Sequence, residues 1–279
     1  MEKRAPKVQE NPKKALIMKG RKSSETMNNL LRDLQLLKGR ERVQMLIRKT
    51  HDFIAMDDPS LIENQSVKYD CSLFAVGSHQ KKRPDNLVLG RVFDGHILDM
   101  FELAVTEFRG TEEFEAPKHI HADMKPILLF QGEFFETNDT LKRLKSLLIG
   151  KYDSYIFFLC FLNSSFFLLD FFHNNDLQEA NIQELKRVMV FTCRGEKDPI
   201  EFRHLESDDI TEAKVQMKTV PFREVGPSFN MKLRRDKMAG NDLFKEACRQ
   251  PKTQNFDKKR ADKNKFTTVL GEKKGKVFL

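Results

Sequence analysis

The same arrangement, a short apolar run closed by glycine and then a helical pattern, occurs twice in this chain. The first copy is ALIMKG, residues 15–20, followed by a helical pattern from Thr26 to Leu37 whose apolar face holds Leu30, Leu34 and Leu37. The second copy is ILLFQG, residues 127–132, followed by a pattern that Asn138 or Asp139 would cap and whose apolar face holds Leu141, Leu144, Leu147 and Leu148. Because the closing glycines are 112 residues apart, the repeat predicts two similar halves that meet near residue 120.

The remaining pattern predicts further strands in both halves. In the first half we expect strands over residues 71–76 and 86–92, joined by a turn through Pro84 and Asp85. After them, residues 96–108 are expected to form a helix, because their apolar side chains recur at helical spacing: Ile97, Met100, Phe101, Ala104 and Phe108. In the second half we expect a meander of strands with turns at 195–199 and 207–209; the strands are residues 188–193, 200–205 and 215–220. Strands and helices together indicate an α/β fold.

Positive charge is concentrated at the two ends of the chain. The whole chain carries +8, residues 1–22 carry +6 and residues 249–279 carry +7, so the stretch between them carries −5. Lysines on a mobile arm neutralise phosphates and release counterions, but soluble tails have the same composition, and charge alone leaves both interpretations open. We expect a basic N-terminal arm, a folded body in two halves and a mobile basic tail; these are residues 1–14, 15–240 (halves about 15–118 and 124–240) and 241–279.

One segment interrupts this pattern. Between Ile156 and Phe172, 13 of 17 residues are apolar and seven are phenylalanine. A membrane span needs roughly 20 such residues, and Asn163 and Asp170 interrupt this one, so we expect no membrane association. A buried hairpin or helix, or an apolar insert near residues 151–170, are the other interpretations.

No motif indicates a catalytic centre or a cofactor. GSHQKKRP and GEKKGK lack the glycine and lysine spacing of a P-loop. His119 and His121 beside Asp123 would face one way on a strand, but no further ligand is indicated, so we expect a solvated linker and no metal. A magnesium-dependent nuclease would need convergent carboxylates, and the sequence indicates none. The four cysteines form no CxxC pair, which indicates a reducing compartment.

Basic clusters inside the body are better candidates for binding. They lie on the predicted turn, at the end of the strand after it, and at the end of the run NMKLRR: Lys81, Lys82, Arg83, Arg91, Arg234 and Arg235. A rigid turn with three cations can meet a phosphate backbone at little ordering cost, and it reads shape in place of bases. No aromatic residues interleave these cations, so base stacking is not expected. Contact with RNA or a partner and an ordinary solvated turn both stay open.

Residues 70–103, DCSLFAVGSHQKKRPDNLVLGRVFDGHILDMFEL, resemble the Brix-domain family of ribosome-assembly factors. Further similar runs are ALIMKG, KPILLFQGEFF, LKRLKSLLI, VGPSFNMKLRR and LGEKKGKVFL, so the resemblance spans nearly all of residues 12–279. The general hallmark of the family is the run from Gly226 and Pro227 to Arg234 and Arg235, whereas GSHQKKRPDNLVLGR indicates one branch of it.

The resemblance implies a Brix domain built of two similar, intertwined α/β halves with flexible basic arms. It also implies a protein that catalyses nothing, needs no cofactor, and acts in the nucleus, in the nucleolus, on precursors of the large (60S) ribosomal subunit. Family members in this branch pair with the regulator of ribosome synthesis 1 and help to dock 5S rRNA with its two bound ribosomal proteins. The alternatives are another Brix-type factor that binds pre-rRNA, or a magnesium-dependent RNA-processing enzyme.

The resemblance also implies which residues meet RNA or a partner protein. They are Lys81, Lys82, Arg83, Arg91, Arg234 and Arg235, and in the tail Lys258, Lys259 and Arg260. Family members continue into a longer lysine-rich tail, so we expect either a lower RNA affinity from the tail or a protein that continues beyond Leu279. They also lack the apolar insert near residues 151–170. Because Gly150-Lys151-Tyr152 can be encoded with a splice-donor string, one hypothesis is an intron retained in frame, which the transcript sequence would test.

Overall fold

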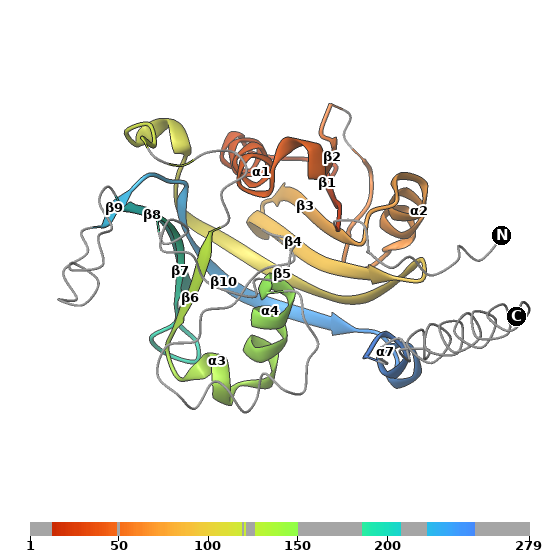
Figure 1. Cartoon of the computed structure of the whole chain (residues 1–279). Helices are drawn as coiled ribbons and strands as arrows, with labels where there is room; N and C mark the ends of the chain where they lie inside the picture. Colours follow the sequence, from red (N-terminus) through yellow and green to blue (C-terminus); the bar gives the residue numbers. More distant parts are fainter. Residues whose placement is uncertain are drawn as a thin grey trace, which may run out of the picture. The chain divides into compact units, whose positions relative to one another are not determined.

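The computed structural model describes residues 13–48, 51–118, 120, 126–149, 186–207 and 222–248. The chain divides into two compact units, residues 1–240 and residues 241–279. In the second unit the structure describes one helix, α7 (Asn241–Cys248). The described residues of the first unit form a ten-stranded mixed sheet with helices packed on it (Figure 1).

The first half of the sheet follows the predicted order of a strand and then a helix. Its elements are β1 (Ala15–Lys19), α1 (Glu25–Lys38), β2 (Val43–Leu46), α2 (Ser60–Tyr69), β3 (Leu73–Gln80), β4 (Arg83–Phe93) and β5 (His96–Arg109), with short 3₁₀ turns at Arg40–Arg42 and Thr111–Glu113. Helix α1 begins after Ser24, whose hydroxyl oxygen accepts a hydrogen bond of 3.1 Å from the Met27 backbone N–H. This side chain satisfies one of the amides that a helix start leaves without a partner.

The second half repeats the plan. Its described elements are β6 (Ile127–Gln131), α3 (Phe134–Thr137), α4 (Asp139–Ile149), β7 (Arg187–Thr192), β8 (Ile200–Ser207), β9 (Phe222–Glu224) and β10 (Ser228–Met238). Of the two predicted caps for α4, Asn138 is the one used. Its side-chain oxygen accepts hydrogen bonds of 3.0 and 3.2 Å from the backbone N–H groups of Thr140 and Leu141. The predicted strands at 188–193 and 200–205 are confirmed by β7 and β8.

The strand order shows how the two halves are related. The order is β2-β1-β3-β4-β5-β10-β8-β7-β6 (Figure 1). The first half contributes β1-β3-β4-β5, counted from one side of the sheet toward its middle, and the second half contributes the equivalent series β6-β7-β8-β10, counted from the opposite side. The outer pairs β1·β3 and β6·β7 are parallel, and the inner pairs in each half are antiparallel. The halves join where β5 and β10 pair antiparallel. This internal symmetry confirms the predicted α/β fold of two similar halves.

The repeated glycines occupy corresponding places in the two halves. The residue before each glycine ends the first strand of its half in parallel register with the next strand, Lys19 beside Gly77 and Gln131 beside Thr192. At Gly132 the φ angle is +120°, and a Cβ would lie 2.0 Å from the carbonyl oxygen of Cys193, so only glycine fits. The close approach of two strands therefore explains why the apolar run ends in glycine.

Two layers of side chains cover the sheet. On one face the leucines of α1 and α4 share a single core with strand residues such as Ala75, Leu89 and Leu103. The alternate strand residues, including Phe74, Val88 and Met100, face the other way and pack against α2 and residues 53–56. Because successive side chains of a strand point to opposite faces, the first half is covered on both sides.

The helix predicted over residues 96–108 is wrong, because this segment is strand β5. The strand is paired on one side with β4 and on the other with β10, and both of its faces are buried. Phe101 and Leu103 face one core and Met100 faces the other. Apolar residues therefore stand at odd and even positions alike, which hides the alternation of a strand and leaves a spacing that imitates a helix.

The first predicted turn is also displaced. Gln80 pairs with Arg83, so the turn is at Lys81 and Lys82, and Pro84 and Asp85 already belong to β4. Strand β10 was not predicted from the sequence. The predicted strand at 215–220, the apolar segment 151–170 and both predicted basic arms, apart from Lys13, Lys14 and residues 241–248, lie outside the described residues. None of the helices in the described ranges has the length and hydropathy that a membrane span requires.

Candidate nucleic-acid interface

The β3–β4 hairpin presents the first predicted basic cluster. Lys81 and Lys82 form its tip and are exposed. Below the tip, the Nδ1 atom of His79 lies 3.0 Å from the carboxylate of Asp85 and also accepts a 3.2 Å hydrogen bond from the Asp85 backbone N–H. These contacts tie the two strands together directly beneath the turn. The two lysines are therefore carried on a rigid support, as the prediction required.

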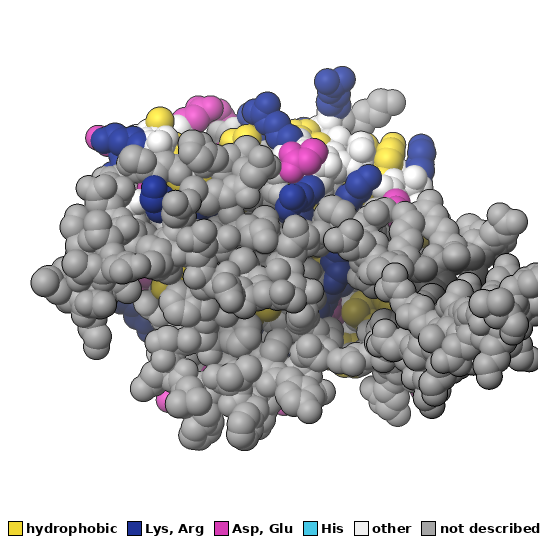
Figure 2. All heavy atoms as spheres, in the orientation of Figure 1, with side chains coloured by type: hydrophobic (Ala, Val, Ile, Leu, Met, Phe, Trp, Pro, Cys, Tyr) yellow, Lys and Arg dark blue, Asp and Glu magenta, His cyan; other side chains and the backbone are white. Residues whose placement is uncertain are grey.

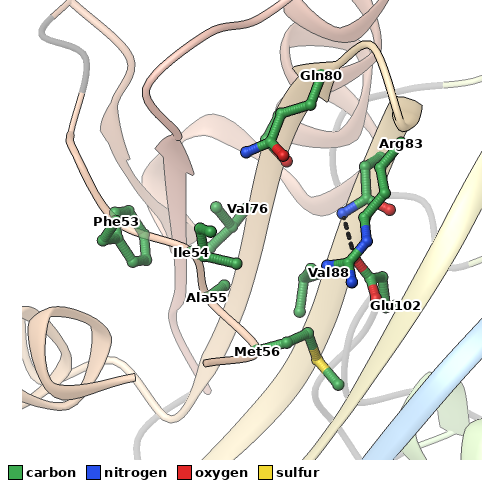
Figure 3. Close-up of a pocket in the computed structure, with 11 residues that line it drawn as sticks. Phe53, Ile54, Ala55, Met56, Val76, Gln80, Arg83, Val88 and Glu102 are labelled. Atoms are coloured by element: carbon green, nitrogen blue, oxygen red, sulfur yellow. Dashed lines mark hydrogen bonds and ion pairs between the residues drawn. The ribbon is translucent and has the colours of Figure 1, made fainter. Parts of the chain in front are cut away.

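Arg83 turns away from the hairpin tip. Its side chain runs along the sheet toward Glu102 of β5, and the two lie 3.3 Å apart between Nη1 and Oε1 (Figure 3). Asn86 of β4 donates a hydrogen bond of 2.9 Å to the same carboxylate oxygen. Glu102 is only 1% exposed, so its charge is held inside the fold by these donors.

The second predicted cluster meets the same carboxylate. Arg235 lies beside Glu102 in the β10–β5 register, and its Nε donates to Glu102 Oε2. A register shift between Leu233 and Arg235 leaves Arg234 without a counterpart on β5. Such a bulge sets two residues against one and bends the strand, so that both arginine side chains reach the same face.

Arg234 and Arg235 use different partners on that face. Arg234 donates to the side-chain oxygen of Asn86 at 2.6 Å and to the backbone oxygen of Pro84 at 3.0 Å. Arg235 also pairs with Asp57 at 3.3 Å, and its hydrogen bond with Glu102 raises the pKa of its guanidinium. We call the set Arg83, Asn86, Glu102, Arg234 and Arg235 the Glu102 cluster. It joins predicted residues that are about 150 positions apart in the sequence.

Arg91 lies elsewhere, on the sheet face that α4 covers. It is 7% exposed, and both its Nε and Nη2 donate to the carboxylate of Asp99. Its Nη1 also lies 3.4 Å from the hydroxyl of Ser146 in α4. This position gives Arg91 a structural role between β4, β5 and α4 in place of the predicted contact with RNA.

The other candidates lie outside the part of the chain that the structure describes. These are Lys258, Lys259 and Arg260 of the tail, and the possible metal ligands His119, His121 and Asp123. Within the described ranges, no group of three or more His, Cys, Asp or Glu side chains has the geometry to hold a metal ion.

Sequence reasoning missed the residues that position the arginines. Glu102 and Asn86 bring three of them together, and a signal for Glu102 was present, since it is a charged residue inside the apolar run 97–105. A shallow hollow beside the cluster was also missed. Gln80, Arg83 and Glu102 lie along one side of this hollow (Figure 3). The rest of its lining is apolar and consists of Phe53, Ile54, Ala55, Met56, Val76 and Val88. Ile54 is 43% exposed there.

The Gly226-Pro227 end of the hallmark has a structural reason. The backbone oxygen of Gly226 accepts a hydrogen bond from Nδ1 of His204, while Nε2 of His204 accepts one of 3.1 Å from Nε of Arg187. Burial, with the Arg187 charge in second place, lowers the pKa of His204 to about 3. The imidazole is therefore neutral and links β7, β8 and the turn before β10.

Further cations lie on the described surface. Figure 2 shows Lys and Arg side chains along the upper edge of the molecule, over α1 and β2, with fewer acidic side chains among them. The basic residues of α1 and of the 3₁₀ turn that follows it include Arg32, Arg40 and Arg42. Within its described part, the fold thus carries basic side chains on its first half beyond the predicted clusters.

The chain matches a family model and several relatives of one name. The family model "Brix domain" matches residues 20–235. A ribosome production factor 2 homolog from Drosophila melanogaster is 34% identical over 99% of this chain and 78% of its own length. Homologs of the same name are 33% identical in Homo sapiens (97% and 80% covered) and 32% identical in Arabidopsis thaliana (100% and 82% covered). A solved structure of a probable ribosomal biogenesis protein from Aeropyrum pernix K1 has a TM-score of 0.45 and 10% identity over 82% of this chain and 99% of that one.

Proposed function

The chain belongs to the Brix-domain family, in the branch of the ribosome production factor 2 homologs, and on this premise we propose that it is a non-catalytic assembly factor for the large (60S) ribosomal subunit. The family and the names of its relatives support a ribosome biogenesis factor in the coarse sense. The finer proposal is that the protein binds rRNA and helps to recruit the 5S ribonucleoprotein to pre-60S particles. Its site of action is then the nucleolus, within the nucleus.

The observation that carries the RNA-binding part is that Arg83, next to the hairpin tip, shares the Glu102 cluster with Arg234 and Arg235. The hairpin tip and the Glu102 cluster hold five cations: Lys81, Lys82, Arg83, Arg234 and Arg235. Three carboxylates lie among them, those of Asp57, Asp85 and Glu102, and Glu102 is buried. The excess of positive charge is thus exposed on a rigid strand pair, which suits contact with a phosphate backbone.

The hollow beside the Glu102 cluster supports the partner part of the proposal. The exposed side chain of Ile54 lies next to charged groups there, and an apolar side chain of a partner protein could be received at this place. The proposed partners are 5S rRNA and pre-rRNA, the regulator of ribosome synthesis 1 homolog, and the two large-subunit ribosomal proteins that bind 5S rRNA. The exposed remainder of Arg83 and Arg235, each about a third of the side chain, can contact either kind of partner.

Binding of fluorescently labelled 5S rRNA by the full chain, measured with the partner protein present as salt is raised, tests this function. Each neutralised phosphate adds roughly −0.7 to −0.9 to the slope of log affinity against log salt. We expect a steep slope, and the variant K81Q/K82Q should have a slope shallower by about 1.5. An affinity that stays flat as salt rises, or no affinity at all, contradicts the proposal.

A matched control removes two exposed lysines away from the hairpin tip. Lys68 lies near the end of α2, whose Val67 approaches Gly95 after β4, and Lys237 lies near the end of β10. The variant K68Q/K237Q loses the same charge as K81Q/K82Q, and its slope should stay close to that of the wild type. Equal losses in both variants would mean that only net charge matters.

A further inference from the structure

Two cations that sequence reasoning left aside lie beside the hairpin tip. Arg21 and Lys22 form the turn between β1 and α1, and both are exposed. The backbone N–H of His79 donates a 2.7 Å hydrogen bond to the carbonyl of Lys22, and Gly20 donates one of 2.9 Å to Gly77. The β1–α1 turn and the β3–β4 hairpin are thus joined backbone to backbone. We call Arg21, Lys22, Lys81 and Lys82 the two-loop surface.

Little in the described structure neutralises this surface. Arg21 lies 3.4 Å from Asp52, but both side chains are at least 70% exposed, and such pairs contribute little. Within the described residues, Lys22, Lys81 and Lys82 form no ion pair. Asp85 is turned toward its neighbours, where it pairs with His79 and accepts a hydrogen bond from the Ser24 hydroxyl. The side chain of Glu25, at the start of α1, is the nearest exposed acid along the chain.

The corresponding loops of the second half have a different charge. The turn between β6 and α3 holds Glu133 in place of the basic pair, and the β7–β8 turn holds Arg194, Glu196, Lys197 and Asp198. Arg194 also pairs with Glu201 at 3.3 Å. These two turns of the second half therefore carry three carboxylates and two cations, whereas the corresponding loops of the first half carry the four cations of the two-loop surface. The fold repeats, but the charge at the equivalent loops does not.

The strand directions place these two sets of loops at opposite ends of the sheet. Strand β3 runs parallel to β1 and, through two antiparallel pairings, parallel to β5. Strand β5 is antiparallel to β10, and β10 runs in the direction of β7 through β8. The carboxyl ends of β1 and β3 therefore point opposite to those of β6 and β7 (Figure 1). Among these four described loops, the two of the first half therefore offer a phosphate chain the more favourable charge.

From these observations we propose that the two-loop surface is an RNA-backbone site, and that the pseudo-symmetric end of the second half takes no part in RNA binding. The proposal rests on the proposed RNA-binding function and deepens it. Arg21 and Lys22 act together with Lys81 and Lys82, because the hydrogen bonds between the loops hold all four cations on one rigid support. Contacts of this kind fix the orientation of the protein on the RNA without reading its sequence.

The test compares charge-removing variants of the full chain with the same labelled 5S rRNA. The variant R21Q/K22Q should reduce the magnitude of the salt slope by about 1.5, as K81Q/K82Q does, and the variant with all four changes should reduce it by about 3. The control R194Q/K197Q removes two cations at the equivalent turn of the second half and should leave the slope unchanged. The variant R21K/K22R keeps the charge and should bind like the wild type. Thermal unfolding of each variant verifies that the fold is kept.

The outcomes separate this inference from the function on which it rests. If the wild type does not bind 5S rRNA, the proposed function fails and the inference with it. If the wild type and K81Q/K82Q behave as expected but R21Q/K22Q keeps the full slope, only the inference is overturned. The same holds if R194Q/K197Q loses as much as R21Q/K22Q, or if R21Q/K22Q loses co-purification of the partner protein with unchanged RNA binding.

Discussion

His204 makes the stability of the first unit depend on pH in a direction that the structure determines. The side chain is 5% exposed and holds Gly226 on one side and Arg187 on the other. Both bonds require a neutral imidazole with its proton on Nδ1. Burial and the neighbouring Arg187 charge lower the pKa of His204 from 6.5 to about 3, while the Gly226 carbonyl and Glu206 act in the opposite direction.

The magnitude follows from proton linkage. The folded-state pKa lies below the unfolded one, so the stabilisation is present above pH 6.5 and is lost as the pH falls toward about 3. Each pH unit inside this window costs up to about 1.4 kcal/mol, because the unfolded chain binds a proton that the folded chain excludes. Between neutral pH and about pH 5 the free energy of unfolding should fall by about 2 kcal/mol from this residue.

Urea unfolding at the two pH values, for the wild type and for His204→Gln, measures this contribution. The variant carries no titratable ring, so its free energy of unfolding should fall by about 2 kcal/mol less than that of the wild type over the same pH step. Comparing the two chains cancels contributions that both share, including those of the other histidines. Equal losses of stability in both chains on acidification would show that His204 does not cause this pH dependence.

Three further changes test the packing and the cluster. Leu144→Ala in α4 should lower the free energy of unfolding by roughly 3 kcal/mol, because Leu144 is fully buried. Leu36→Ala in α1 is the control: this side chain is 46% exposed, so its loss should cost less than about 0.5 kcal/mol. Chemical unfolding measures both. Asn138→Ala should cost about 1 kcal/mol by removing the cap of α4, and Asn138→Asp, which keeps an oxygen acceptor, should cost much less. Glu102→Gln should lower the free energy of unfolding by about 2 kcal/mol, as measured by thermal unfolding. This is less than for a fully buried ion pair, because the arginine partners Arg83 and Arg235 are about a third exposed. No loss would mean that the Glu102 cluster contributes no stability.

The sequence predicted the residues of the candidate site only in part. The hairpin lysines were identified from a turn that is rich in cations between two apolar runs, and the structure places them at an exposed tip. Arg234 and Arg235 stood out only as a basic pair, and their link to Arg83 needed the pairing of β10 with β5. Arg91 was misjudged, because a cation next to an exposed strand end and a cation buried with Asp99 look the same in sequence.

Local pattern was sufficient for the elements that show one face to the core. The repeated strand, glycine and helix of the two halves, and the leucine faces of α1 and α4, could be predicted because each depends on neighbours within a few residues. Strand β5 depends on partners more than a hundred residues later, so its two buried faces and its place at the join were decided by the tertiary structure. The same is true of the charge clusters, since an ion pair across strands exists only once the sheet sets the register.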